Sequence, residues 1–186
     1  MITLRKSELF KRFEEAMRRS GLTFLWISDG KDHPATYLII NFENSFRLRL
    51  YIWNLSFGGR VSLPDELRIQ VTGLPKIDGR QHFTRDGVGK TAILGWSENF
   101  GEFAAFDIER HLDALGDSPS IQIRKPALDD AKINGLALHI RGSDELAFAV
   151  RPDYLGAYLE NMGELHSCAS SEHAVKLLAD TNGLWG

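Results

Sequence analysis

The chain is poor in cysteine and lacks any long apolar run, and each shortage excludes a class of protein. Only one of its 186 residues, Cys168, is a cysteine, so neither an intrachain disulfide framework nor a zinc site with several cysteine ligands can form. No apolar run reaches the roughly 18 residues that a membrane-spanning helix needs, and the first residues lack the apolar stretch of a signal peptide. We therefore expect a cytoplasmic protein that has no membrane partner.

Charge is close to balanced overall but unevenly distributed along the chain. The formal net charge is −3 and the pI about 6.1, which by itself argues against a nucleic-acid partner. Residues 1–100 carry 15 Lys and Arg against 11 Asp and Glu, whereas residues 101–186 carry 7 against 14. A chain polarised in this way can present a basic face to DNA. We expect the acidic residues after position 100 to lie mostly off that face, apart from the turn near Trp96.

Apolar periodicity predicts a mainly β (α+β) fold in which short helices flank the strands. The expected strands are 22–27, 35–42, 46–53, 66–72, 91–96, 102–106, 121–123, 136–141 and 145–150. Helical patterns cover the N-terminus up to Gly21 and the segments 108–115, 126–134, 154–162 and 172–179. Because helices do not alternate regularly with strands, a doubly wound parallel sheet is excluded and a β-barrel that is closed or nearly closed is favoured. We expect an N-terminal helix at 1–20, the barrel domain at 21–166 and a tail or linker helix at 167–186.

The segment 46–53 alternates most clearly. Phe46, Leu48, Leu50 and Ile52 share one face, and the other face carries Arg47, Arg49, Tyr51 and Trp53. Period-two alternation of this kind predicts a strand with one buried and one solvated face.

Three short motifs resemble catalytic or ligand sites. Asp86–Thr91 resembles a phosphate-binding loop, but its first glycine is replaced by Thr84 and a strand pattern follows it, so a glycine-bearing loop is the better interpretation. The acidic runs at 65–66 and 107–109 lack the lysine of a metal-dependent nuclease; Glu66 is expected to alternate outward and Asp107 to cap a helix. Cys168 next to His166 is expected to be an ordinary small apolar residue. We predict no catalytic residue, no metal and no cofactor.

Two polar loops in the first hundred residues are more informative. Residues 28–33 offer a hydroxyl, carboxylates, an ammonium and an imidazole, and residues 80–91 offer a second set of such groups. Base edges in the major groove are recognised by Arg or Lys at guanine, Gln at adenine and Asp or Glu at cytosine. The loops hold all of these residue types, although solvated loops are polar in any protein.

Several segments together resemble the bacterial DNA-binding pseudobarrel domains. These are relatives of the plant B-three transcription-factor domain and occur in restriction endonucleases of the BfiI, NgoAVII, UbaLAI and EcoRII kind. The resemblance covers about residues 20–166 and rests on Leu50–Gly59, Asp65–Gly73, Leu94–Trp96, Ala105–Asp107, Ser118–Ile123 and Ala149–Pro152. It implies a seven-stranded open barrel that places two arms in the major groove of double-stranded DNA. The tip at Asp86–Gly89 departs from the denser basic arms of that family.

The resemblance assigns the two polar loops as these arms. The N-arm is 28–35, with Ser28, Asp29, Lys31, Asp32 and His33, and the C-arm is 80–91, with Arg80, Gln81, His82, Thr84, Arg85, Asp86, Lys90 and Thr91. Contacts to the DNA backbone, which position a protein without specifying sequence, fall to Arg60, Trp96, Ser97 and Asn99.

The implied function is sequence-specific recognition of double-stranded DNA by the non-catalytic specificity domain of a type II restriction endonuclease. We expect the domain to be monomeric and its partner to be a nuclease domain of the same polypeptide or complex. One alternative is a regulatory β-barrel that binds a small molecule or a phosphorylated ligand at Gly87–Thr91. An intrinsic metal-dependent nuclease is the third.

Overall fold

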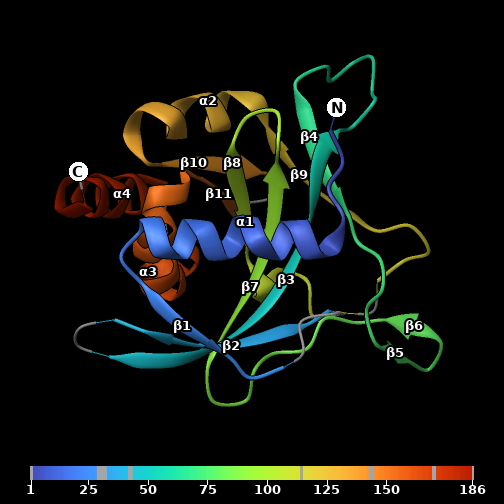
Figure 1. The fold of residues 1–186 in the computed structure, drawn as a ribbon. Coiled ribbons are helices and arrows are strands. Elements are labelled where there is room, and N and C mark those ends of the chain that lie inside the picture. The colour runs from blue at the N-terminus through green and yellow to red at the C-terminus, as the bar shows by residue number, and fades with distance from the viewer. Residues whose placement is uncertain are drawn as a thin grey trace.

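The computed structural model describes residues 2–28, 33–41, 44–113, 115–142, 145–168 and 171–185. A large, mostly antiparallel sheet curves through the molecule, and helices cover its outer side (Figure 1). The helices are α1 (Lys6–Arg19), α2 (Lys125–Asn134), α3 (Leu155–Ser167) and α4 (Ser171–Trp185), with short 3-10 turns η1 (Ile108–Arg110) and η2 (Pro152–Tyr154). The sheet strands are β1 (Thr23–Trp26), β2 (Ala35–Ile40), β3 (Ser45–Phe57), β4 (Glu66–Gln70), β7 (Lys90–Ser97), β8 (Glu102–Phe106), β9 (Ser120–Arg124), β10 (Leu136–Arg141) and β11 (Glu145–Val150). A separate two-stranded hairpin is formed by β5 (Lys76–Ile77) and β6 (Arg80–Gln81).

The strand pairing describes an open barrel of seven strands with two more strands attached. The main path runs β1-β2-β3-β7-β8-β11-β10, while β4 pairs with the far end of β3 and β9 pairs with β4. The seven strands β9-β4-β3-β7-β8-β11-β10 therefore form one continuous ribbon whose ends, β9 and β10, are not paired with each other. The connection between these two ends is α2, and the expected open, mainly β architecture is confirmed.

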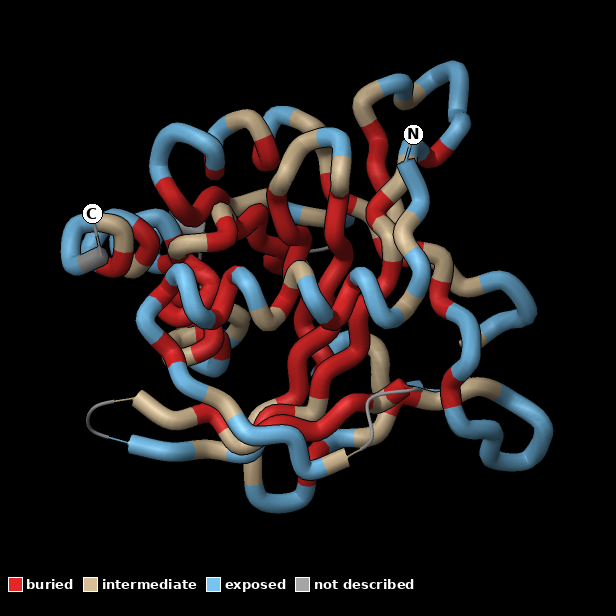
Figure 2. The backbone as a smooth tube through the Cα atoms, viewed as in Figure 1, coloured by how far each residue is buried: buried red, intermediate tan, exposed pale blue. Residues whose placement is uncertain are grey.

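Two apolar clusters lie on the two sides of this curved sheet. The barrel interior is filled by side chains from all seven barrel strands, such as Trp53, Ile69, Ile93, Phe106, Ile121, Ala137 and Ala149. The outer cluster packs α1, α3 and α4 on the opposite face of β2, β3, β7 and β11. In Figure 2 the central strands are buried along most of their length, whereas the protruding loops are exposed.

Long β3 belongs to both clusters, which corrects one expectation. Leu48, Leu50 and Ile52 face the outer cluster as the alternation predicts. The other face is not solvated along its whole length, because Tyr51 and Trp53 are buried inside the barrel. Arg47 and Arg49, near the start of the strand, keep access to solvent, and so does Phe57 at its end. This face becomes buried at Tyr51 and Trp53 because strands that are distant in the sequence pack over it.

Of two expectations about acidic residues, the one for Asp107 is confirmed and the one for Glu66 is corrected. Asp107 caps η1, since its carboxylate accepts a hydrogen bond from Glu109 N at 2.9 Å, as predicted. Glu66 lies on the outer face of β4 but is buried rather than exposed. A Cβ at Gly58 would collide with the Glu66 carboxylate, so the loop that follows β3 covers this side chain.

The C-terminal helix is joined to the barrel at the free edge of β10. The Asn182 side-chain amide accepts a hydrogen bond from Leu136 N at 3.0 Å and donates one to Leu136 O at 3.1 Å. It thus bonds both backbone groups of Leu136, as a neighbouring strand would. Among the described residues, no helix is both long and apolar enough to cross a membrane.

Candidate nucleic-acid interface

One residue from each predicted arm belongs to an aromatic cluster inside the barrel. His33, which precedes β2, stacks on Trp53 with ring centroids 4.5 Å apart. Phe83, from the C-arm, packs edge-on against Trp53 at 5.9 Å and against Tyr51 at 5.0 Å. His33 and Phe83 are buried. Segments 50 residues apart are therefore fixed against the same two rings of β3.

The part of the C-arm region that projects from the body is the hairpin β5–β6 (Figure 1). Lys76 pairs with Gln81 and Ile77 with Arg80, across the two-residue turn Asp78–Gly79. Both turn residues have positive φ, 50° and 80°, which is typical of the type I′ turn of tight hairpins. The side chains of Lys76, Ile77 and Arg80 are exposed.

The base of the hairpin is closed by its own hydrogen bonds and is joined to one neighbouring segment. His82 N donates to Pro75 O at 3.0 Å, across the two sides of the base. Gln81 Oε1 accepts a hydrogen bond from Leu74 N at 3.2 Å. Leu115 N, from the segment after η1, donates to Gln81 O at 3.0 Å and connects the ribbon to the body.

The rest of the predicted C-arm, from Thr84 to Thr91, is tied into the body instead of projecting. Arg49 donates to Thr84 Oγ1 at 2.6 Å. Arg85 forms an ion pair with Glu109 of η1. Asp86 is buried and lies 3.1 Å from an Arg47 guanidinium nitrogen.

Lys90 and Thr91 complete this inward attachment. Lys90 Nζ donates to the backbone carbonyls of Leu159 and Glu160, both at 2.7 Å. Burial lowers the pKa of Lys90. Thr91 Oγ1 accepts a hydrogen bond from Asp86 N at 2.8 Å. These predicted contact residues therefore have partners inside the protein already, and they hold the hairpin's neighbourhood rigid.

Of the predicted N-arm, Asp29, Lys31 and Asp32 lie outside the described residues. Ser28 is half-buried and accepts a hydrogen bond from Thr36 N at 2.9 Å, which closes the start of the loop onto β2. His33 belongs to the aromatic cluster and is not presented at the surface.

The residues predicted to contact the DNA backbone lie elsewhere. The loop with Arg60 and the turn after β7 lie at the top of Figure 1, at the opposite end of the barrel from the hairpin. Arg60 is 3.5 Å from the Glu66 carboxylate. Trp96 and Ser97 are buried, and Asn99 accepts a hydrogen bond from Ile2 N at 3.0 Å. The structure does not bring these residues together with the arms.

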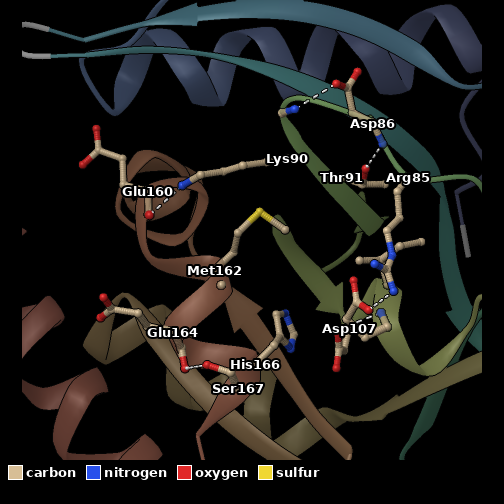
Figure 3. A pocket seen from close by; sticks show the side chains of 14 residues that line it. Arg85, Asp86, Lys90, Thr91, Asp107, Glu160, Met162, Glu164, His166 and Ser167 are labelled. Carbon is tan, nitrogen blue, oxygen red and sulfur yellow. Dashed lines mark hydrogen bonds and ion pairs between the residues drawn. The ribbon is translucent and has the colours of Figure 1, made fainter.

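A cavity of about 540 Å³ lies beside the inward part of the C-arm, between β7, η1 and α3 (Figure 3). Five of the side chains that line it are carboxylates: Asp86, Asp107, Glu109, Glu160 and Glu164. The cations of Arg85 and Lys90 also line it, but both are already bound to groups of the protein as described above. Glu109, paired with Arg85, is an acidic residue after position 100 that does lie against an arm. An acidic lining of this kind disfavours an anionic ligand.

The loop that resembles a phosphate site is closed by its own carboxylate. Val88 N and Gly89 N both donate to Asp86 Oδ1, at 3.1 and 2.9 Å. These amides would have to face a phosphate in a binding loop. The loop is followed by β7, a strand, as the sequence indicated. It is a tight turn whose Gly89 packs on the backbone of Arg47.

The remaining motif residues also have structural partners. His166 is bonded at both ring nitrogens, to Tyr158 Oη and Leu146 O, each at 3.0 Å. Cys168 is half-buried against the outer cluster, and burial together with Glu164 raises the pKa of its thiol. Within the described residues there is no group of three or more His, Cys, Asp or Glu side chains placed to hold a metal ion.

The family of the chain follows from its middle part. The family model described as Methylase-associated X1 matches residues 46–159. The chain belongs to the Methylase-associated X1 family. The matched segment runs from β3 into α3 and so contains all seven barrel strands together with the β5–β6 hairpin. No curated protein and no solved structure matches the chain significantly.

The description of the Methylase-associated X1 family indicates a role associated with restriction–modification. This agrees with the broader part of the expectation from sequence. The match is to this family and not to the pseudobarrel domains that the sequence resembles, so recognition of DNA is treated below as a proposal.

Two exposed residues of the projecting hairpin were missed by sequence reasoning. Lys76 and Ile77 lie on the projecting hairpin, before the expected start of the C-arm at position 80. The signal was present, because Asp78–Gly79 is one of the strongest short-range hairpin signals in a sequence.

Proposed function

We propose that this Methylase-associated X1 domain recognises a specific sequence in double-stranded DNA and that the β5–β6 hairpin enters the major groove. The domain acts without catalysis of its own, next to a methylase or nuclease of the same restriction–modification system. It acts as a monomer that presents the β5–β6 ribbon to the DNA.

The observation that carries the proposal is the placement of unengaged cations. Lys76 and Arg80 are exposed on the hairpin, and among the described residues their side chains form no hydrogen bond or ion pair. Arg47, Arg49, Arg85 and Lys90, which lie closer to the barrel, all bind groups of the protein itself. A projecting, rigid ribbon with free cations fits the major groove, which admits a two-stranded β-ribbon.

The competing functions have less support. A phosphorylated ligand at Gly87–Thr91 would compete with the Asp86 carboxylate for the loop amides, as shown by their hydrogen bonds. An intrinsic nuclease needs converging metal ligands. We expect the purified chain to leave plasmid DNA uncut in the presence of magnesium, and clean site-specific cleavage would refute the non-catalytic role.

Selection from random duplexes followed by binding measurements tests the proposal. We expect one short site to be enriched. Arg80→Ala should weaken binding to that site about tenfold or more, because a good arginine–guanine contact is worth about 1–3 kcal/mol. Lys76→Ala should weaken binding to specific and random duplexes to a similar degree.

Two controls make the result specific to the hairpin. Lys176→Ala removes an exposed cation from α4, far along the chain from the arms, and should leave affinity unchanged. Arg60→Ala removes a cation at the opposite end of the barrel and separates the two sets of predicted contacts. If no sequence is enriched, or if Arg80→Ala binds the selected duplex like the wild type, recognition by the hairpin is wrong.

A further inference from the structure

We propose that Ile77 and Arg80 form a paired reader of a pyrimidine 5-methyl group next to a guanine. The ligand class is a duplex that carries thymine or 5-methylcytosine at the contacted step. The inference rests on the proposed function and goes beyond it, because it names the chemical group that one side chain recognises.

The register of the hairpin places the two side chains together. Ile77 and Arg80 are cross-strand partners, and side chains directly opposite each other in an antiparallel pair project from the same face. The second pair, Lys76 and Gln81, projects from the other face. On that face Gln81 is half-buried and accepts a hydrogen bond from Leu74 N, whereas Ile77 and Arg80 are both exposed.

The turn makes this face rigid and narrow. Asp78 and Gly79 at φ 50° and 80° form a loop of only two residues between the paired strands. The base is held by the bonds of His82 N and Leu115 N described above. A short ribbon that is closed by a two-residue turn and hydrogen-bonded at its base loses less entropy on binding than a flexible loop does.

The exposure of Ile77 is the feature that needs an explanation. This large apolar side chain is 52% exposed, beside a guanidinium that has no partner among the described residues. A guanidinium binds guanine O6 and N7 in the major groove, and an apolar side chain contacts the 5-methyl group of a pyrimidine. The methyl group of a pyrimidine stacked next to that guanine would cover Ile77 while Arg80 binds the guanine.

A methyl scan of the selected site tests the inference. Each thymine is replaced singly by uracil, and each cytosine singly by 5-methylcytosine. For the wild type we expect removal of one thymine methyl, or addition of one cytosine methyl at the contacted step, to change affinity about three- to fivefold, the value of one buried methyl group. The uracil series and the 5-methylcytosine series together distinguish thymine from 5-methylcytosine as the natural ligand.

The variant Ile77→Ala should abolish this methyl effect while it keeps the preference for guanine, and Arg80→Ala should relax the preference for that guanine. Val88→Ala is the matched control, because Val88 is also exposed and apolar but lies on the Asp86–Gly89 turn. Methyl effects of equal size in the wild type and in Ile77→Ala would overturn the inference while leaving DNA recognition intact. Failure of the wild type to bind any selected duplex would instead refute the proposed function, and the inference with it.

Discussion

Glu102 shows what burial does to a single carboxyl group in this barrel. It lies at the start of β8, is buried, and has one carboxylate oxygen, Oε2, without a hydrogen-bond partner. Burial raises its pKa to about 8, and the nearby cations Lys132 and Arg151 offset only part of that effect. Because the pKa is higher in the folded than in the unfolded chain, this group stabilises the fold fully below about pH 4.5, and the contribution is lost as the pH rises towards 8.

We therefore expect Glu102→Gln to change the pH dependence of stability. The variant should have nearly the wild-type free energy of unfolding at pH 5 and exceed it by a few kcal/mol at pH 8.5, since each unit of pKa difference is worth about 1.4 kcal/mol. Urea unfolding at both pH values measures this difference, with Glu172→Gln on the exposed face of α4 as the control. Parallel pH profiles for Glu102→Gln and the wild type would show that the carboxyl is ionised in the folded protein.

At the scale of elements, the β5–β6 hairpin depends on the left-handed backbone of its turn. An alanine at Gly79 meets no atom within 4 Å but must keep φ near 80°, which costs a non-glycine residue about 1–2 kcal/mol. We expect Gly79→Ala to loosen the ribbon and to weaken binding to the selected duplex about five- to tenfold, with a small effect on global unfolding. Gly59→Ala is a close control, because Gly59 has φ 74° and open space around it at the other end of the barrel. Equal losses of affinity in the two variants would contradict a role for the hairpin.

Elements with a local signal were predictable from the sequence. The strands 102–106, 136–141 and 145–150 have the expected bounds, because short, largely apolar runs next to Gly101, Gly135 and Gly142 define them locally. The burial of Tyr51 and Trp53 was not predictable, since their cover comes from Phe83 and from strands many residues away. The internal contacts of the C-arm were not predictable for the same reason. Arg85 and Lys90 bind Glu109 and backbone carbonyls of α3, which are distant in the sequence.

At the scale of the whole molecule, several cations away from the arms are paired with carboxylates. Ion pairs join Arg12 to Glu98, Arg124 to Asp65 and Arg151 to Asp153. The acidic lining of the cavity beside β7 further reduces the positive potential near the barrel. Paired cations of this kind attract DNA weakly, so we expect contacts made by the hairpin to dominate binding to the specific site.

The salt dependence of binding measures how many phosphate contacts the protein makes. We expect log K for the selected duplex to fall with log of the salt concentration with a slope on the order of −2 to −4, because each phosphate contact contributes about −0.9. Lys76→Ala should reduce the magnitude of the slope by about 1, whereas Arg80→Ala should lower affinity with little change in slope, because Arg80 is proposed to contact a base. Fluorescence anisotropy between about 50 and 300 mM salt gives all three slopes. A slope near zero would indicate a partner other than DNA, and a steep slope shared by random duplexes would indicate a phosphate-binding surface without sequence recognition.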